Sequence, residues 1–421
     1  MSSSTGPGAL WERALADVID AGHLVVAERL SAVLDDAVGP LGLDAELLVA
    51  DTAQRVLIPL HPEPREPVDI GATVPGRAYQ YGDILEGTAE DGGCTVWIPV
   101  LDGMDRLGVL RIGLDARPVP RIDGVRDDPL LHRRLWTLAG LAGHVLAAKS
   151  VYSDRVRRRR SRGPISAPSE LLWQMMLPRT AATERLVVSA VLEPHRDVAG
   201  DAYDYSVEGD RVDLAVFDAA GHDLRAGTTA ALAVTGTRNA RRDGERDLRA
   251  VADRAHALIA TQPGPPRFAT AVLAALDTAS GVLEYLNAGH VPPLLVRRGK
   301  VVKELSGPHR VPLGVATRAS DGLPPVRVAR EQLEPGDQLL MYSDGVTEAR
   351  DAHGAFFGED RLVELTERAA ADRLPAPETL RRLAIAVLDH QDGRLQDDAT
   401  LLLVEWSHTA HLRMIPSFTD G

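Results

Sequence analysis

The ten residues LAVFDAAGHD, Leu214–Asp223, constrain the fold of this chain more than any other stretch. The first half is an apolar run with strand character, and the run stops at Asp218, where small residues predict a turn. A strand that delivers a carboxylate to a Gly- and Ala-rich turn can hold a charged ligand at the edge of a sheet. A single strand-end aspartate usually caps the next helix, so Asp218 alone decides nothing.

Three further stretches place aspartates in the same setting. Asp201 lies in VAGDAYDY, Asp344 in LLMYSDGVTEA, and Asp397 and Asp398 in QDDATLLLV. Each stands beside an apolar run with strand character and a Gly- or Ala-rich bend. Carboxylates that are far apart in the chain but all at strand ends predict a shared, oxygen-rich cation site.

Composition limits the remaining possibilities. A chain of 421 residues is long enough for two or three domains. It has no run near the ~20 apolar residues of a membrane span and no export signal at its N-terminus, so we expect a cytoplasmic protein without membrane insertion. The single cysteine, Cys94, excludes an internal disulfide and a cysteine-built zinc site. The net charge of −13 argues against nucleic-acid binding through a basic surface.

One block of the chain, RVRRRRSR at 155–162, is strongly basic. It could contact phosphate groups or a membrane surface. A solvated helix end or linker is the interpretation that we favour for such a charge run.

The N-terminal region predicts a small α/β sensory domain over residues 10–127. An amphipathic helix is expected over 10–38 and a strand over Ala45–Asp51, followed by a Pro-rich stretch that cannot be helical. CTVWIPVLDGMDRLGVLRIGL, Cys94–Leu114, predicts two strands joined by an Asp-Gly turn at Asp102–Gly103. Cys94 itself is expected to be a small core residue.

This region resembles a GAF domain. The resemblance lies in GATVPGRAYQYGD at 71–83 and in the later WIPV and RLGVLRIGL. It implies that the domain binds a small ligand or mediates dimerisation, and the sequence does not identify the ligand.

Residues 128–178 predict a helical linker between two domains. A long helix is expected over 128–160, and Gly163 and Pro164 end it. A second short helix is expected at Ser169–Pro178. The first helix has an apolar seam with heptad spacing, which could form a short coiled coil in a homodimer or pack against its own domain. The seam consists of Leu131, Leu135, Leu138, Ala142 and Val145.

The second half alternates short apolar strands with fewer helices. Such a pattern of antiparallel strands and segregated helices predicts an α+β layered sandwich, not a doubly wound parallel sheet. The expected strands are Leu186–Leu192, Val212–Phe217, Phe268–Leu276, Gly281–Asn287, Pro293–Val296, Val301–Leu305, Gln338–Tyr342 and Thr400–Trp406.

The ordered motifs of this half resemble the SpoIIE-like branch of the metal-dependent serine/threonine phosphatases, the type 2C or PPM family. They are VAGDAYDY, FDAAGHD, FATAVLAALD, LNAGHVPPLL, VPLGV, LLMYSDGVTEA and DDATLLLV. The resemblance implies a phosphatase domain over 179–407, followed by a C-terminal tail over 408–421. It implies an α-β-β-α sandwich of two antiparallel sheets, with two Mn²⁺ or Mg²⁺ ions at one edge.

The residue types agree with that chemistry. Hard divalent cations prefer carboxylate, carbonyl and water oxygens, and the sequence has no Cys or His cluster for softer metals. Two such ions about 3.5–4 Å apart can activate one water for in-line attack on phosphorus, so no covalent enzyme intermediate is needed.

The resemblance also assigns individual positions. Asp218 is expected to bridge the two ions as the central catalytic carboxylate, with the carbonyl of Ala219 as a further ligand. Asp201 is expected to serve one ion.

The other ion is expected to be held by Asp344 and Asp397. Asp398 is the alternative to Asp397, and whichever of the two is not the ligand would hold its neighbour in place.

His222 is expected either to protonate the leaving serine oxygen, as a histidine at a similar place does in relatives, or to tie the turn by a ring hydrogen bond. The family's Gly-His-Gly is Gly221–His222–Asp223 here. The extra carboxylate of Asp223 could tune metal affinity or cap the helix that starts at Leu224. Gly200, Gly221 and Gly345 are expected to supply backbone freedom beside the ligands.

Four other polar residues are expected to be structural. Asp204 is predicted to form a hydrogen-bonded turn, and Asp210 and Asp213 to lie on a hairpin surface. His290 in the LNAGH motif is predicted to belong to a structural turn.

Together these features predict a phosphatase that acts on phosphoserine or phosphothreonine under the control of the N-terminal domain. By resemblance, the substrate is a small phosphorylated regulator, such as an anti-anti-sigma factor of the STAS type. The alternative is a catalytically weak scaffold that binds a phosphorylated partner, and only Asp223 motivates it.

Overall fold

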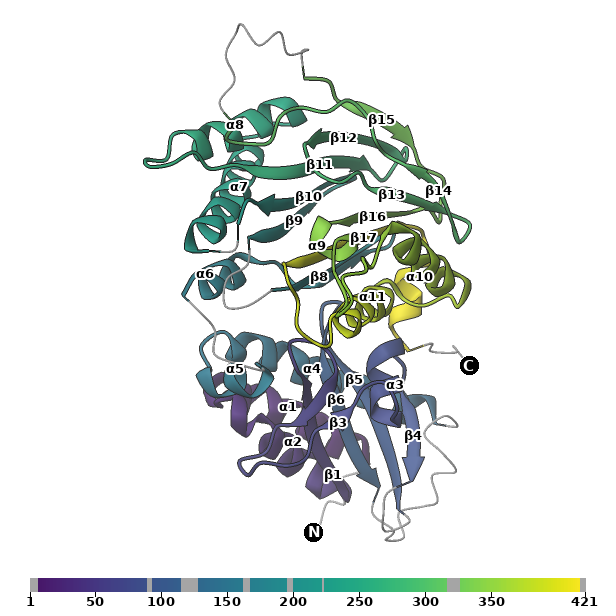
Figure 1. The fold of residues 1–421 in the computed structure, drawn as a ribbon. Helices are drawn as coiled ribbons and strands as arrows, with labels where there is room; N and C mark the ends of the chain where they lie inside the picture. Colours follow the sequence, from purple (N-terminus) through teal and green to yellow (C-terminus); the bar gives the residue numbers. More distant parts are fainter. Residues whose placement is uncertain are drawn as a thin grey trace, which may run out of the picture. The chain divides into compact units, whose positions relative to one another are not determined.

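The computed structural model describes residues 7–88, 93–114, 128–161, 167–194, 200–221, 223–315 and 326–416 (Figure 1). The chain divides into two compact units. One comprises Met1–Gly163 together with Leu412–Gly421, and the other comprises Pro164–His411. Within the described ranges, every helix is too short or too polar to cross a membrane.

The first unit is built on a six-stranded antiparallel sheet with the strand order β3-β2-β1-β6-β5-β4. Side chains alternate between its two faces. In β1, Leu47 and Val49 join the core beneath α1, α2 and α4, whereas Leu48 and Ala50 join the core beneath α3. The strands are β1 (Leu43–Ala50), β2 (Val56–Pro59), β3 (Val68–Asp69), β4 (Leu85–Thr88), β5 (Cys94–Asp102) and β6 (Asp105–Leu114). The helices named here are α1 (Pro7–Leu24), α2 (Leu30–Val38), α3 (Val74–Tyr81) and α4 (Pro129–Ser150).

The expected hairpin of Cys94–Leu114 is present as β5 and β6, which pair antiparallel across the turn after Asp102 with a register shift between Val100 and Leu101. The expectation that Cys94 is a core residue is wrong, because its side chain is exposed. Cys94 is the first residue of β5, and burial begins only at the next residue, Thr95.

The single helix expected over 10–38 is also wrong. The chain leaves α1 at Leu24, takes an extended backbone at Val26 and makes a short 3₁₀ turn before α2. A continuous helix of that length would be about 43 Å long, which exceeds the ~30 Å diameter of a small domain. The break lets α2 fold back, so that Leu30 and Leu34 are fully buried.

The long helix expected over 128–160 is likewise two helices, α4 and α5 (Asp154–Arg160). The hydroxyl of Ser153 caps α5 by accepting from the Val156 backbone N–H. Four seam residues are buried in the core of the first unit, and Val145 packs against it. For this face of α4, the structure therefore shows packing against its own unit. The four buried residues are Leu131, Leu135, Leu138 and Ala142.

The basic block forms α5, and several of its arginines donate to backbone carbonyls. Arg155 donates to the Pro62 carbonyl at 2.9 Å, and Arg160 donates through Nε to the Ala50 carbonyl at 2.9 Å. Arg159 donates to the carbonyl of His61. The block is thus a short helix of its own, not the solvated helix end or linker that we favoured, and its side chains fasten the Pro-rich stretch and the end of β1.

Truncation of Leu135 to alanine tests the packing of α4. We expect Leu135→Ala to lower the free energy of unfolding of the first unit by about 2–5 kcal/mol, because the side chain is fully buried. Thermal unfolding measures the change, and Thr137→Ala on the exposed side of α4 is the control. If Leu135 belongs to a dimer seam instead, its replacement lowers the sedimentation-derived dimer fraction and leaves the stability of the monomer unchanged.

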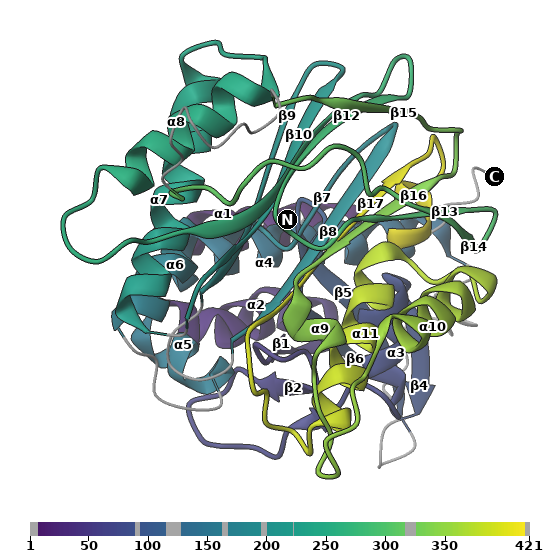
Figure 2. The ribbon, with the colours of Figure 1, turned by 45° about the horizontal axis from the view of Figure 1, so that its top comes forward.

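The second unit is the expected α+β layered sandwich of two antiparallel sheets. The strand order is β15-β12-β11-β10-β9 in one sheet and β14-β13-β16-β17-β8-β7 in the other. Helices α7 and α8 cover the first sheet, and α10 and α11 cover the second (Figures 1 and 2). The first sheet consists of β9 (Asp201–Glu208), β10 (Arg211–Ala219), β11 (Ala269–Asp277), β12 (Val282–Ala288) and β15 (Ala329–Gln332). The second consists of β7 (Thr180–Thr183), β8 (Leu186–Glu193), β13 (Leu294–Arg297), β14 (Lys300–Glu304), β16 (Gln338–Tyr342) and β17 (Ala399–Trp406). The helices are α6 (Ala167–Met175), α7 (Leu224–Arg242), α8 (Leu248–Ala260), α9 (Asp344–Thr347), α10 (Glu359–Ala371) and α11 (Ala376–His390).

Sequence patterning did not predict β7, β9 or β15. The strand β9, DAYDYSVE, has few aliphatic residues, yet its first five residues are buried. Asp204 is tolerated there because Arg238 and Arg241 of α7 pair with its carboxylate. A buried acidic residue with partners about 35 positions away leaves no local signal in the sequence.

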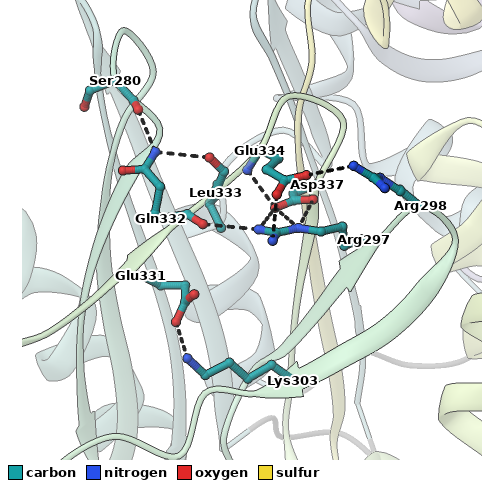
Figure 3. A network of polar contacts seen from close by, with 9 residues as sticks. All are labelled: Ser280, Arg297, Arg298, Lys303, Glu331, Gln332, Leu333, Glu334 and Asp337. Carbon is teal, nitrogen blue, oxygen red and sulfur yellow. Dashed lines mark hydrogen bonds and ion pairs between the residues drawn. The ribbon is translucent and has the colours of Figure 1, made fainter.

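The two sheets are joined at one end by a polar network (Figure 3). Arg297 at the end of β13 donates to the carboxylate of Asp337, at 2.7 Å from Nη2 to Oδ2, and to the carbonyl of Gln332 in the opposite sheet. Asp337 precedes β16, whereas Asp344 follows it, so the network lies at the end of β16 away from Asp344. On the same side, Trp406 donates from Nε1 to the Thr278 carbonyl at 3.0 Å.

Candidate functional site

Two of the sequence-predicted aspartates face each other in the first sheet. Asp201 opens β9 and Asp218 lies next to the end of β10, and the antiparallel register pairs them directly. Directly opposite residues point to the same face, with Cβ atoms about 4.5–5.5 Å apart. The expected meeting of these carboxylates therefore follows from strand register alone.

The other aspartates lie at neighbouring strand ends in the second sheet. Asp344 follows the end of β16, and Asp397 and Asp398 precede the start of β17, its antiparallel partner. Ser343 and Thr400 hold these ends together. The Ser343 N–H donates to the Thr400 carbonyl at 3.0 Å, and the Thr400 N–H donates to Oγ of Ser343 at 3.0 Å.

Hydrogen bonds join the two pairs of strand ends across the sandwich. The Gly200 N–H donates to Oδ2 of Asp398, so the start of β9 is tied to the start of β17. The hydroxyl groups of Ser343 and Thr400 lie beside the carboxylate of Asp201, where they offset part of the rise in its pKa. The structure thus brings all five aspartates together at one edge of the sandwich.

Two glycines are required here because the backbones approach closely. A Cβ atom on Gly345 would lie 1.9 Å from the carbonyl oxygen of Asp398. One on Gly200 would lie 2.8 Å from the carbonyl oxygen of Ala219. The expected role of backbone freedom applies to Gly221, whose φ is +94°. At Gly200 and Gly345 the requirement is the missing side chain.

Burial and mutual repulsion raise the pKa values of three of these carboxyl groups. For Asp201, desolvation raises the pKa most, followed by the charges of Asp218 and Asp398. Desolvation, together with Asp344 and the Asp397–Asp398 pair, raises the pKa of Asp218 to about 7. The pKa of Asp344 is raised by desolvation and by Asp397. The cluster is therefore electrostatically unfavourable when ionised, and a cation would relieve it.

The donor set fits a hard divalent cation. Oδ2 of Asp201 is buried and has no hydrogen-bond partner in the described part of the chain. All the converging groups are carboxylate, carbonyl or hydroxyl oxygens, the donors that Mg²⁺ and Mn²⁺ prefer. Nowhere in the described ranges do three or more His, Cys, Asp or Glu side chains form one ready cation-binding group. Water would therefore complete the coordination of an ion held there, as is usual for Mg²⁺.

The structure distinguishes the two adjacent aspartates. Asp398 is 2% exposed, and its carboxylate accepts from Gly200. Asp397 is exposed, and its Oδ1 accepts from the Asp398 backbone N–H at 2.9 Å. Asp398 thus has a structural bond across the sheets, whereas Asp397 lies on the accessible side.

His222 and Asp223, the two polar residues that follow Gly221, were each predicted to have one of two roles. His222 lies outside the described residues. Asp223 is the N-cap of α7, and its Oδ1 accepts from the backbone N–H groups of Arg225 at 2.9 Å and Ala226 at 3.0 Å. Of the two roles considered for Asp223, the structure shows helix capping.

The remaining acidic residues do not join the site. The expected turn at Asp204 is wrong, because Asp204 is a fully buried strand residue that is ion-paired with arginines of α7. The expected surface position of Asp213 is also wrong, since it is 5% exposed and pairs with Arg211 at 2.8 Å. Asp210 is exposed, as expected, and pairs with Arg185.

Three hydroxyl residues next to the aspartates were not identified from the sequence. They are Thr270, Ser343 and Thr400, whose hydroxyl groups lie beside the carboxylates of Asp201 or Asp218. The signal available for Ser343 and Thr400 was their position beside Asp344 and the Asp397–Asp398 pair. Thr270 had no such signal, because only the pairing of β10 with β11 places it opposite Asp218.

Residues 208–407 match the sequence family of stage II sporulation protein E, SpoIIE. The second unit contains a SpoIIE-type domain. The SpoIIE family is a PP2C-type serine/threonine phosphatase family, so the expected family relationship is confirmed.

Individual relatives have low sequence identity to this chain. Protein IcfG of Synechocystis sp. is 29% identical over 276 residues, which cover 57% of this chain and 39% of IcfG. The phosphoserine phosphatase RsbU of Bacillus subtilis is 20% identical over 66% of this chain and 80% of RsbU. Among solved structures, the SiaA-PP2C domain of Pseudomonas aeruginosa is 23% identical over 52% of this chain and 85% of that domain, with a TM-score of 0.45.

The raised pKa of Asp218 predicts a pH-dependent stability. A carboxyl group whose pKa is raised on folding favours the folded state below its ordinary pKa of 3.8, and this contribution is lost as the pH rises through about 7. In EDTA, we therefore expect the melting temperature to fall between about pH 4 and pH 7. Asp218→Asn should raise the melting temperature in EDTA at pH 8 and should abolish the stabilisation by Mn²⁺.

Asp210→Asn, which changes an exposed carboxylate, is the control and should leave both quantities unchanged. An Asp218→Asn variant that is still stabilised by Mn²⁺ as strongly as the wild type would contradict the role of Asp218 in cation binding.

Proposed function

We propose that the chain is a metal-dependent protein phosphatase that hydrolyses phosphoserine or phosphothreonine. The observation that supports this most directly is the convergence of Asp201, Asp218, Asp344 and the Asp397–Asp398 pair at one edge of a SpoIIE-type domain. This cluster of oxygen donors contains no nucleophilic cysteine, and Cys94 lies in the first unit.

The proposed cofactors are two Mn²⁺ or Mg²⁺ ions. When bound, such ions activate a water as the nucleophile and stabilise negative charge on the phosphoryl oxygens. Asp218 would serve both ions, with the carbonyl of Ala219, and Asp201 would serve one of them through its unpartnered Oδ2.

At the second strand pair, Asp344 and Asp397 would be ligands, and Asp398 would keep the Gly200 backbone in place. The exposure of Asp397 and the bond from Gly200 to Asp398 support this division. His222 is proposed to protonate the leaving serine or threonine oxygen.

The proposed substrate is a small phosphorylated regulatory protein of the STAS, anti-anti-sigma type. The SpoIIE family match and the similarity to RsbU support a place in the regulation of a sigma factor. No observation favours the scaffold alternative, since its only motive was Asp223, which caps α7.

Phosphate release from a panel of serine-phosphorylated STAS-type proteins tests the activity. We expect release that requires Mn²⁺ or Mg²⁺ and that falls at least about 100-fold in Asp218→Asn and Asp344→Asn, because each removes a proposed ligand. Two control variants separate the loss of a metal ligand from the loss of any other carboxylate. Asp210→Asn changes an exposed carboxylate, and Asp204→Asn changes a buried structural one. Equal turnover by Asp218→Asn and the wild type would reject the proposed reaction.

We further propose that the first unit is a GAF-like sensory domain that controls the SpoIIE-type domain. The antiparallel sheet with helices on both faces supports this assignment. A homodimer through α4 would have to use a face other than the apolar seam, because the seam residues lie in the core of the first unit.

The segment after α6 is a candidate route for this control. Tyr203 and Tyr205 of β9 donate their hydroxyl groups to the carbonyls of Leu177 at 2.8 Å and Pro178 at 2.7 Å. Arg238 donates to the Met175 carbonyl at 2.8 Å and pairs with Asp204 of the same strand. The linker is therefore fastened to the strand that begins with Asp201.

The double variant Tyr203→Phe/Tyr205→Phe removes two of these fastenings and keeps the rings. We expect faster amide exchange over 176–183 and weaker Mn²⁺ binding, because the two carbonyls lose their donors and β9 loses part of its support. Tyr285→Phe is the matched control, because it removes the hydroxyl of another tyrosine of the same sheet, which lies beside Gly307. Unchanged Mn²⁺ affinity in the double variant would count against this route.

A further inference from the structure

His290 is buried between the two pairs of strand ends and is held firmly from its backbone. It is 6% exposed and follows β12. Asn287 accepts from the His290 N–H at 2.8 Å and donates from Nδ2 to the His290 carbonyl at 2.8 Å. These two bonds fix the backbone of the turn and therefore the point from which the imidazole side chain extends.

The two ring nitrogens contact different sheets. Nε2 lies 3.1 Å from the carbonyl oxygen of Tyr342, and because a carbonyl can only accept, Nε2 carries the proton. Nδ1 lies 2.6 Å from Oγ1 of Thr270. Burial lowers the pKa of His290 to about 4, so the ring is neutral at pH 7 and Nδ1 accepts from the Thr270 hydroxyl.

Both partners adjoin proposed metal ligands. Thr270 is directly opposite Asp218 in the pairing of β10 with β11. Tyr342 ends β16, two residues before Asp344. The imidazole therefore spans from the sheet that carries Asp218 to the sheet that carries Asp344.

We propose that His290 is a positioning residue that sets the spacing of Asp218 and Asp344 for cation binding, acting through Thr270 and the Tyr342 carbonyl. This inference rests on the proposed metal-dependent function. The hydroxyl of Thr270 also lies within reach of Asp218 but has a single proton. The short contact to Nδ1 takes that proton, so the Asp218 carboxylate keeps its lone pairs for a cation.

Calorimetric titration of the full-length protein with Mn²⁺, without substrate, tests this role. Thr270→Val removes the hydroxyl and keeps the shape of the side chain, whereas Thr270→Ser keeps the hydroxyl. We expect Thr270→Val to raise the Kd for Mn²⁺ about tenfold, the usual effect of losing a residue that orients a ligand. Thr270→Ser should bind Mn²⁺ nearly as well as the wild type.

The melting temperature in EDTA distinguishes positioning from simple structural support. A merely structural contact would lower this temperature in Thr270→Val and leave the Kd for Mn²⁺ unchanged, which would overturn the proposal. A wild type that binds no Mn²⁺ would overturn the proposed function as well. If the wild type binds Mn²⁺ and Thr270→Val binds it equally well, only the role of His290 fails.

His290→Leu and the double variant His290→Leu/Thr270→Val complete the test. If the two residues act as one unit, the double variant should bind Mn²⁺ no more weakly than His290→Leu alone, because non-additivity marks residues that share an interaction. Independent, additive losses of affinity would contradict the proposal. Should His290→Leu not fold, the comparison of Thr270→Val with Thr270→Ser decides the question.

Discussion

The second unit keeps carboxylate groups away from water at the ends of four strands, and much of its architecture serves to hold them there. Removing a charged group from water is costly unless it is paired or hydrogen-bonded. Asp204 and Asp337 meet that requirement with arginines. Asp201 has the hydroxyl groups of Ser343 and Thr400 beside its carboxylate and keeps one buried oxygen without a hydrogen-bond partner in the described part of the chain. The same fold thus neutralises its structural aspartates internally and leaves the strand-end cluster to be neutralised from outside, as the proposed cations would do.

The geometry of that cluster depends on how the two sheets are joined. Far from the cluster, the network around Arg297 and the Trp406 indole connect the sheets. Near it, the connections are the bond from Gly200 to Asp398 and the imidazole of His290. Because both ends of the sandwich are tied, the strand ends have little freedom to move apart under the repulsion between the carboxylates. Positions set by such backbone and side-chain bonds are preorganised, which is what a binding site for small, hard ions requires.

Much of this was predictable from the sequence, and the exceptions have physical causes. The aspartates could be recognised because each interrupts an apolar strand beside small residues, and the sandwich followed from the spacing of those strands. The strand β9 was not predicted, because its buried polar residues depend on distant arginines of α7. The breaks at Val26 and between α4 and α5 were missed because local patterning does not encode the size of the core that a helix must fit. The hydroxyls of Thr270, Ser343 and Thr400 entered the site through strand register, which a single sequence does not show.

The first unit is not continuous in the chain, because Leu412–Gly421 belongs to it together with Met1–Gly163. Met414 is buried, and Gly82 leaves room for its backbone, since a Cβ atom there would lie 2.1 Å from the Met414 carbonyl oxygen. The SpoIIE-type domain is therefore inserted, in the topological sense, between two parts of its neighbour. Cleavage at one site therefore cannot release the first unit intact. A change that destabilises the 3₁₀ turn at His411–Met414 also affects the N-terminal part of that unit.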